Sequence, residues 1–384
     1  MILKGVKVRL YPTAAQQEAI ENNFRLNRFL WNQLLGMQIA RHENGGSFVN
    51  KFGMNYLIKA MKIEFPFLKE AESTSLLYTS ADLADSYDRF FKKQNGFPGF
   101  KSRRHPKNSY KSNCVNGNIQ VADNHCLKLP KLGLVKANGL QRVKDRIKSV
   151  VVRKKADGTF EATLLVAFEA KTFASTGKAV GIDLGLTDLA SQSDGFKLRN
   201  KQFERSLAKR KRQWQRKFAR RRLLALKKIE VRKQATGENL ELSTFKNVQK
   251  AKEQVARINK KIANQRNDYL QKYTTRLVKK YDLIAMEDLK TKNFLQNHHL
   301  SRSISDAAWA RIKSMLAYKC EWYGKELVLV NPAYTSQICA HCGENTGKKP
   351  LCIRTFDCPH CHTTGIDRDV NAAINILNKA LAQR

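Results

Sequence analysis

The chain has 384 residues, and its 71 Lys and Arg against 33 Asp and Glu give a formal net charge of +38. This imbalance indicates a polyanionic partner, because each neutralised phosphate releases counterions and adds affinity. A hydrophobic content of 42% allows a buried core and argues against global disorder. No apolar run approaches the roughly 20 residues of a membrane span, so no membrane partner is expected.

The first strand is expected at residues 4–11, where apolar and polar residues alternate up to Pro12. Thr13 is expected to cap the helix that follows, with Gln16 at the capping-box position. Apolar residues then keep helical spacing between Ile20 and Phe91, with a break at residues 44–47, and the pattern changes near residues 95–101. We therefore expect a helical segment here.

Between about residues 112 and 170 the pattern changes to short alternating runs separated by turns. Residues 149–153 and 159–168 are expected to form a hairpin across Asp157-Gly158. This region is predicted to be a small β-barrel that includes the first strand, with the helical segment as an insertion.

From Ala179 the pattern is typical of an α/β domain, with buried strands expected at 179–184, 282–287 and 326–330. Residues 201–234 contain 15 basic and 2 acidic residues and are expected to pair with a helix at about 246–280 as an antiparallel hairpin. A solvated helix face is the alternative, but the charge density favours a nucleic-acid track. The candidate contacts are Lys209, Arg210, Lys211, Arg212, Arg216, Lys217, Arg220, Arg221 and Arg222.

Three acidic residues stand at the ends of predicted elements: Asp183 and Glu287 in strands, and Asp369 at a helix start. Each has a structural alternative, since a buried strand Asp can be structural and a helix-start Asp is usually a cap. Asp288 and Asp367 compete for the roles of Glu287 and Asp369. The order strand Asp, strand-end Glu, helix-start Asp matches an RNase H-like active site. Carboxylates suit Mg²⁺, and three of them can hold two ions for phosphodiester hydrolysis.

Four of the eight cysteines form the pattern C-x2-C-x15-C-x2-C, namely Cys339, Cys342, Cys358 and Cys361. This spacing is that of a zinc ribbon, and four thiolates without an open position indicate a structural Zn²⁺. His341, His360 and His362 are spare donors, and His362 could replace a cysteine. Metal-bound thiolates and the absence of a signal-peptide pattern predict a cytoplasmic protein.

Together these segments resemble the TnpB family of transposon-encoded RNA-guided DNA endonucleases, which are related to type V CRISPR effectors. The resemblance is carried by Gly181-Ile182-Asp183-Leu184-Gly185, Met286-Glu287-Asp288-Leu289, Tyr334-Thr335-Ser336-Gln337, the four cysteines and Asp369-Val370-Asn371-Ala372-Ala373. Gly96-Phe97-Pro98-Gly99-Phe100-Lys101 also looks like a family segment, although Gly99 stands where Arg is common. Lys101, Arg103 and Arg104 are further candidate nucleic-acid contacts.

The resemblance implies a wedge β-barrel from residues 1–12 and 110–175 that carries a helical recognition insertion at 13–109. It also implies a RuvC-like nuclease domain at 176–332, the zinc ribbon at 333–365 and a C-terminal RuvC helix at 366–384. Implied partners are a guide RNA from the transposon end, double-stranded target DNA beside a short flanking motif, and the displaced single strand. The alternatives are a nuclease-dead, RNA-guided DNA-binding regulator, a strand-joining transposase or a transposase accessory protein. From composition alone, a ribosomal-type or membrane-surface protein is a further alternative.

Overall fold

The computed structural model describes residues 2–103, 106–170, 172–238, 240–289, 306–350 and 352–383. The chain divides into two compact units, Met1–Glu169 and Ala170–Arg384, each with its own buried core. None of the described helices is both long and apolar enough to cross a lipid bilayer.

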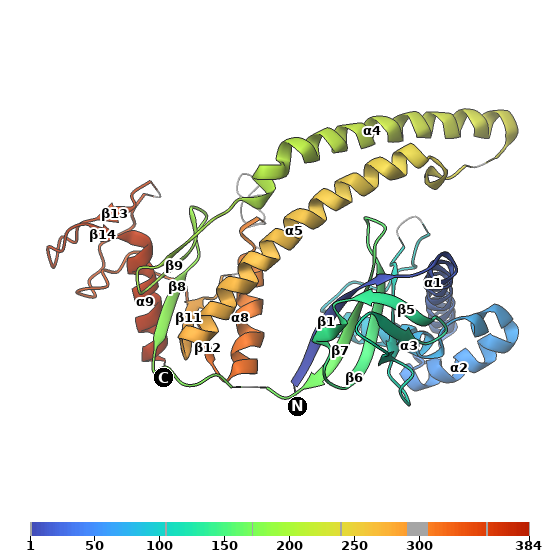
Figure 1. The fold of residues 1–384 in the computed structure, drawn as a ribbon, viewed down its shortest axis with the longest axis horizontal. Helices are drawn as coiled ribbons and strands as arrows, with labels where there is room; N and C mark the ends of the chain where they lie inside the picture. Colours follow the sequence, from blue (N-terminus) through green and yellow to red (C-terminus); the bar gives the residue numbers. More distant parts are fainter. Residues whose placement is uncertain are drawn as a thin grey trace. The chain divides into compact units, whose positions relative to one another are not determined.

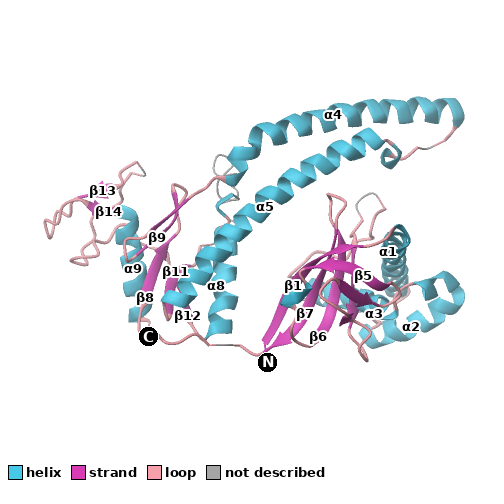
Figure 2. Ribbon diagram, viewed as in Figure 1, coloured by secondary structure: helices cyan, strands magenta, loops and turns pink. Residues whose placement is uncertain are grey.

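The first unit combines an antiparallel sheet with helices (Figures 1 and 2). Its strands are β1 (Ile2–Tyr11), β2 (Ser109–Asn113), β3 (Gln120–Val121), β4 (Cys126–Leu129), β5 (Gly133–Asn138), β6 (Ile147–Lys154) and β7 (Phe160–Phe168). Its helices are α1 (Ala14–Glu43), α2 (Lys51–Glu64) and α3 (Ser73–Phe91), with short 3-10 turns η1 (Pro66–Glu70) and η2 (Leu140–Arg142). The predicted cap is present, because Thr13 and Gln16 form a reciprocal capping box at the start of α1.

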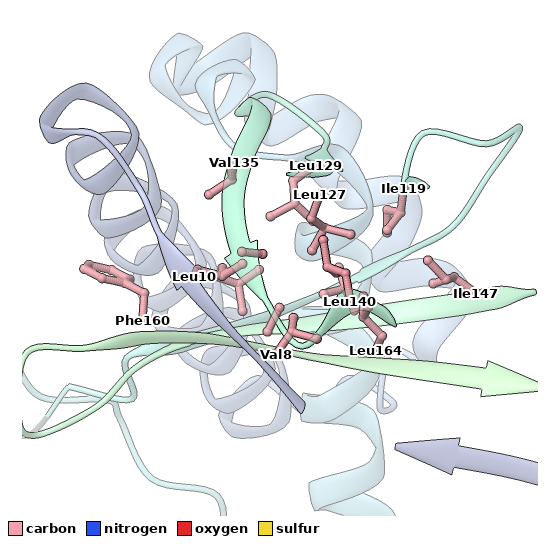
Figure 3. Close-up of a cluster of buried hydrophobic side chains, with 14 of the residues drawn as sticks. Val8, Leu10, Ile119, Leu127, Leu129, Val135, Leu140, Ile147, Phe160 and Leu164 are labelled. Atoms are coloured by element: carbon pink, nitrogen blue, oxygen red, sulfur yellow. The ribbon is translucent and has the colours of Figure 1, made fainter. Parts of the chain in front are cut away.

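The seven strands are ordered β2-β6-β7-β1-β5-β4-β3, so the N-terminal strand lies inside the sheet and the predicted β6–β7 hairpin is present. The expected closed barrel is not observed among the described residues: β2 and β3 are the edges of an open sheet. With two residues, β3 is too short to offer a ladder for closure. Alternating side chains such as Val8, Leu10, Leu127 and Leu164 fill the core (Figure 3).

The second unit is built on a five-stranded mixed sheet ordered β10-β9-β8-β11-β12. Its strands are β8 (Ala179–Asp183), β9 (Asp188–Gln192), β10 (Lys197–Arg199), β11 (Leu283–Glu287) and β12 (Glu326–Val330). Strands β8, β11 and β12 are parallel, and β9 and β10 extend the sheet antiparallel. The three parallel strands are those expected from the sequence, whereas β9 and β10 were not anticipated.

Helices cover both faces of this sheet (Figure 1). Ile182, Ile284 and Met286 face α5 (Lys246–Lys280) and α8 (Trp309–Tyr323). Leu283, Ala285 and Val330 face α9 (Arg368–Ala382). Because neighbouring strand residues point to opposite faces, this assigns the odd-numbered positions of β8 and β11 to the α9 face.

Two further features belong to the second unit. Helix α4 (Phe203–Thr236) runs beside α5, and the connection passes through Gly237, at φ +69°, and the turn η3 (Leu242–Thr244) (Figure 2). The cysteine-rich segment between β12 and α9 contains a small hairpin of β13 (Thr355–Phe356) and β14 (Ile366–Asp367).

Candidate nuclease centre and zinc site

Asp183 and Glu287 end adjacent parallel strands in matching positions. The last recorded pair of the β8–β11 ladder is Ile182 with Met286, so each acid is the next residue of its strand. Both belong to the set of residues that faces α9, and parallel strands lie about 4.8 Å apart. The two carboxylates therefore lie at the carboxyl-terminal ends of neighbouring strands, on the same face of the sheet.

Helix α9 adds Asp369 in its first turn and packs very closely on β8. A β-carbon on Gly181 would lie 1.9 Å from the backbone oxygen of Ala373, so only glycine permits this approach. Ala373 is one helical turn after Asp369, on the same side of α9. Gly181, two residues before Asp183, thus brings the start of α9 toward the strand ends.

The electrostatics place Glu287 and Asp369 near enough to Asp183 to act on its pKa, although the described structure does not bring the oxygens of the three acids as close together as the sulfur atoms of the four cysteines. Burial, followed by repulsion from Glu287 and Asp369, raises the pKa of Asp183 to about 7. Burial also raises the pKa of Glu287, although a hydrogen bond from Thr335 partly opposes the shift. A cation would relieve this repulsion, and carboxylate oxygens are the ligands that Mg²⁺ prefers, so these residues fit the expected metal.

Asp367 and Asp369 have different roles in the structure. Asp367 is the N-cap of α9: its Oδ1 accepts the backbone N–H groups of Asp369 and Val370, and its Oδ2 pairs with Lys197 at 2.6 Å. Burial acts upward on the pKa of Asp367, but the Lys197 and backbone hydrogen bonds outweigh it and lower that pKa. Asp369 makes no capping bond and lies 3.5 Å from Arg354. Its carboxylate therefore remains the one suited to the shared site.

Asp288 forms an ion pair away from Asp183 and Glu287. It follows β11, and its carboxylate pairs with Lys313 of α8. The side chain is half exposed, at 52%. Glu287 is thus the acid of this pair that shares the electrostatics of Asp183.

The four cysteines form a compact cluster whose sulfur atoms all lie within 4.8 Å of one another. The Sγ atoms of Cys339 and Cys361 are 3.8 Å apart, and those of Cys342 and Cys358 are 3.7 Å apart. A tetrahedral site with Zn–S bonds of about 2.3 Å has S–S edges of about 3.8 Å. The cluster fits a tetrahedral zinc ion, and the three neighbouring histidines, all exposed, are not part of it.

The basic residues predicted as a track lie along α4, and most are exposed. Among the residues that the structure describes, Ala225 is the one residue of α4 that is buried. Two members are engaged locally: Lys211 pairs with Glu204, and Arg221 donates to the backbone oxygen of Asn247 on α5. The others present cations to solvent, with Lys217 lying over Trp214.

The segment around Lys101 is held firmly in the first unit. Asn32 accepts from the backbone N–H of Lys101 and donates to its backbone oxygen, while Trp31 donates to the backbone oxygen of Gly99. The Lys101 ammonium lies 3.3 Å from the centre of the Trp31 ring, and burial, then repulsion from Lys107, lowers its pKa to about 7. Arg103 is exposed, and Arg104 lies outside the described residues.

The roles of several residues of the site were not predicted from the sequence, although Gly181 and Thr335 lie in motifs that carry the family resemblance. Gly181 acts through its contact with α9, and Lys197 and Arg354 act as partners of Asp367 and Asp369. Thr335 reaches Glu287 from 48 positions away. Such pairings require folded coordinates, although a glycine inside a strand does suggest close backbone approach.

An α/β sheet with acids at the ends of adjacent parallel strands, beside a four-cysteine cluster that could hold zinc, is the arrangement of a nuclease-type domain. Family profiles match three parts of the chain: "Cas12f1-like, TNB domain" at residues 309–376, "Probable transposase" (OrfB of IS605) at 163–298 and "Helix-turn-helix domain" at 1–47. In this structure the described residues of the last segment form β1 and the single long helix α1.

Relatives match over nearly the whole chain. A Streptomyces pristinaespiralis protein provisionally named an RNA-guided DNA endonuclease is 32% identical, covering 99% of this chain and 90% of its own. InsQ of Escherichia coli K12, which has the same provisional name, is 30% identical over 98% and 92%. The chain therefore belongs to the TnpB family of IS605-type RNA-guided DNA endonucleases. Its fold is similar to Cas12f1 in a cryo-EM complex with sgRNA and target DNA (TM-score 0.50, 14% identity, 98% and 99% coverage).

Proposed function

We propose that this protein is an RNA-guided DNA endonuclease that hydrolyses phosphodiester bonds with Asp183, Glu287 and Asp369. One observation carries the proposal: two carboxylates end adjacent parallel strands in register, and α9 adds a third on the same face. The names of the full-length relatives agree with it. Composition alone would also suit a ribosomal-type protein, but such a role gives no reason to gather three repelling acids.

The three carboxylates would hold Mg²⁺, and the four cysteines would hold Zn²⁺. Held by these carboxylates, Mg²⁺ would supply activation of the attacking water and charge stabilisation at the leaving 3′ oxygen of the scissile phosphate. Asp183 and Glu287 supply fixed ligands because strand pairing sets their separation. Gly181 lets Asp369 approach, and Asp367 keeps the helix start in place with Lys197. Asn371 and Asn375 of α9 bind the backbone at the start of the ribbon.

Each part of the chain then has a role. Residues 1–12 and 110–175 would form the wedge, with 13–109 as the recognition insertion. Residues 176–332 and 366–384 would form the RuvC-like nuclease domain, interrupted by the ribbon at 333–365. The open sheet of the first unit would serve as the wedge in place of the closed barrel expected from the sequence.

The partners would be a guide RNA from the transposon end, double-stranded target DNA and the displaced strand. The exposed cations of α4, with Lys101, Arg103 and Arg104, would contact phosphates without reading bases. A protein that delegates sequence reading to base pairing needs mainly such backbone contacts. The expected place of action is the cytoplasm of a prokaryotic cell, at the nucleoid when DNA is bound.

The test is to express the full chain with its flanking transposon DNA, sequence the RNA that copurifies, and reprogram its guide portion. Incubation with a plasmid carrying the matching target behind randomised flanking bases should yield Mg²⁺-dependent cuts beside one short motif. Bound plasmid without cuts would favour the regulator, joined strands would favour a transposase, and absence of a specific RNA would overturn the proposal.

A further inference from the structure

Thr335 links the zinc ribbon to the nuclease centre. It lies between β12 and the first cysteine pair, and its side chain is buried, with 4% of the residue exposed. Its Oγ1 is 2.5 Å from Glu287 Oε1 and 3.2 Å from the backbone oxygen of Pro332. A hydroxyl has one proton to donate, and the shorter distance to a charged acceptor assigns it to Glu287.

Helix α9 fixes the segment that carries Thr335. Asn375 donates to the backbone oxygens of Thr335, at 2.9 Å, and Ile338, at 2.7 Å. One turn earlier, Asn371 accepts from the backbone N–H of Ala340 and donates to the same Ile338 oxygen. Both amides are buried, with 1% of Asn371 and 6% of Asn375 exposed. Their use is thus to clamp residues 335–340, which include Cys339 of the first cysteine pair, onto α9.

We propose that Thr335 is a positioning residue: it holds the carboxylate of Glu287 in the orientation that binds metal, and α9 and the ribbon hold Thr335. This rests on the proposed function. The hydrogen bond fixes Oε1 and uses one of the carboxylate's four lone pairs, so the other lone pairs remain for a ligand. Partners of this kind set the geometry of metal ligands, and their loss typically costs about 10- to 100-fold in metal affinity or activity.

The linkage explains why the ribbon is inserted where it is. The same helix supplies Asp369 to the acids and, two residues later, begins the amide clamp on the ribbon. A ribbon that came away from α9 would release Thr335, and Glu287 would lose its fixed orientation. The zinc site therefore acts on the nuclease centre through hydrogen bonds, without supplying a ligand to it.

The test compares Thr335→Val, which keeps the shape and loses the hydroxyl, with Thr335→Ser, which keeps the hydroxyl. The probe is Mn²⁺. Its binding to the complex of the full-length protein with its RNA is measured from the electron paramagnetic resonance signal of the free ion. Thr335→Val should weaken the site by about tenfold or more, and Thr335→Ser should stay within about threefold of wild type. Single-turnover cleavage of prebound DNA should follow the same order, with DNA affinity and zinc content unchanged.

Equal Mn²⁺ binding in wild type and Thr335→Val, or a Thr335→Ser defect as large as that of Thr335→Val, would overturn the inference. If Thr335→Val does not fold, Asn375→Asp takes its place in the test. This change removes the N–H donors of Asn375 with little change of shape, and it should weaken Mn²⁺ binding. Asp183→Ala distinguishes the two levels of the argument. If the Asp183→Ala protein binds as much Mn²⁺ as wild type, the proposed function fails. If Asp183→Ala loses Mn²⁺ binding but Thr335→Val binds Mn²⁺ normally, only the positioning role of Thr335 fails.

Discussion

The backbone oxygen of Ala373 lies 1.9 Å from where a β-carbon on Gly181 would stand. The contact joins β8, which carries Asp183, to α9, which carries Asp369. Because backbone cannot yield as a flexible side chain can, one methyl group at this position must move the helix. The distance between two proposed metal ligands, Asp183 and Asp369, therefore depends on Gly181, which is not itself a proposed ligand.

Gly181→Ala should destabilise the second unit and reduce cleavage by orders of magnitude. Overpacking a tight interior contact costs typically 1–3 kcal/mol, and here the clash is with backbone. Thermal unfolding and single-turnover cleavage measure the two effects. Gly36→Ala is the matched control: it lies within α1 with no atom within 4 Å of the added carbon, so stability should be unchanged or slightly raised. Wild-type cleavage by Gly181→Ala would contradict the proposed role of α9.

Asp183→Ala, Glu287→Ala and Asp369→Ala should each abolish cleavage and leave guided DNA binding intact. Metal stabilisation of the transition state is worth several kcal/mol, so the loss should be orders of magnitude in rate. Gel-shift binding and cleavage are measured on the same preparations. Asp367→Asn is the control, because it retains an oxygen for the capping bonds of α9. Loss of cleavage in Asp367→Asn with normal cleavage in Asp369→Ala would reverse the assignment within the pair.

Asp183→Asn should stabilise the protein in Mg²⁺-free buffer at pH 8. Burial and the neighbouring acids raise the pKa of Asp183 to about 7, above its unfolded value, so its ionised form opposes folding. The protonated side chain is tolerated at pH 5, and stability is lost as the pH rises through 7. The gain should be on the order of 1–3 kcal/mol at pH 8 and small at pH 5, after allowance for the partial exposure of the site. An equal effect at both pH values in thermal unfolding would be inconsistent with a shared acidic site.

One zinc ion per chain should copurify and survive mild EDTA treatment, whereas activity should need added Mg²⁺. Cys358→Ser should lose the zinc and loosen the ribbon, since metal binding supplies folding free energy to such small elements. Cys352→Ser offers a control within the same segment: Cys352 is exposed and outside the cluster, so it should keep its zinc. Elemental analysis showing no zinc in reduced wild-type protein would refute the ribbon.

Replacing Arg216, Arg220 and Arg222 with Gln should weaken RNA and heteroduplex binding for matched and unrelated sequences alike. These three are exposed on α4, whereas Arg221 is held by Asn247 and is left unchanged. Each lost phosphate contact should flatten the salt dependence by roughly 0.7 to 0.9 log units per log unit of salt. The three Arg→Lys changes retain the charge and should largely preserve the slope. An unchanged slope in the Gln variant would make α4 an ordinary solvated helix.

The elements that sequence predicts well here are those with local signals. Strand ends predicted the positions of Asp183 and Glu287 in the sheet, and cysteine spacing predicted that the four sulfur atoms lie in one cluster. The capping box at Thr13 was also predictable from the sequence, because it involves residues only three positions apart. Alternation along the strands of the first unit indicated a sheet but could not decide whether it closes, since pairing between its edges is non-local.

The rest depends on proximity in the fold. Nothing local marks Thr335 as a partner of Glu287, or Lys197 as a partner of Asp367. Strands β9 and β10 were missed because they are short and contain few apolar residues in alternation. Asp369 was preferred to Asp367 from the sequence, but that Asp367 is the residue that caps α9 is visible only in the hydrogen bonds of the helix start.

The position of α9 in the sequence determines when the centre can exist during synthesis. A ribosome releases β8 and β11 first, then the ribbon, and only afterwards the helix with Asp369, Ile376 and Ala380. Until then Leu283, Ala285 and Val330 have no cover on their face of the sheet. A nascent chain, or a product of premature termination before α9, would therefore lack the proposed ligand Asp369 and would expose the apolar face of the sheet that α9 covers.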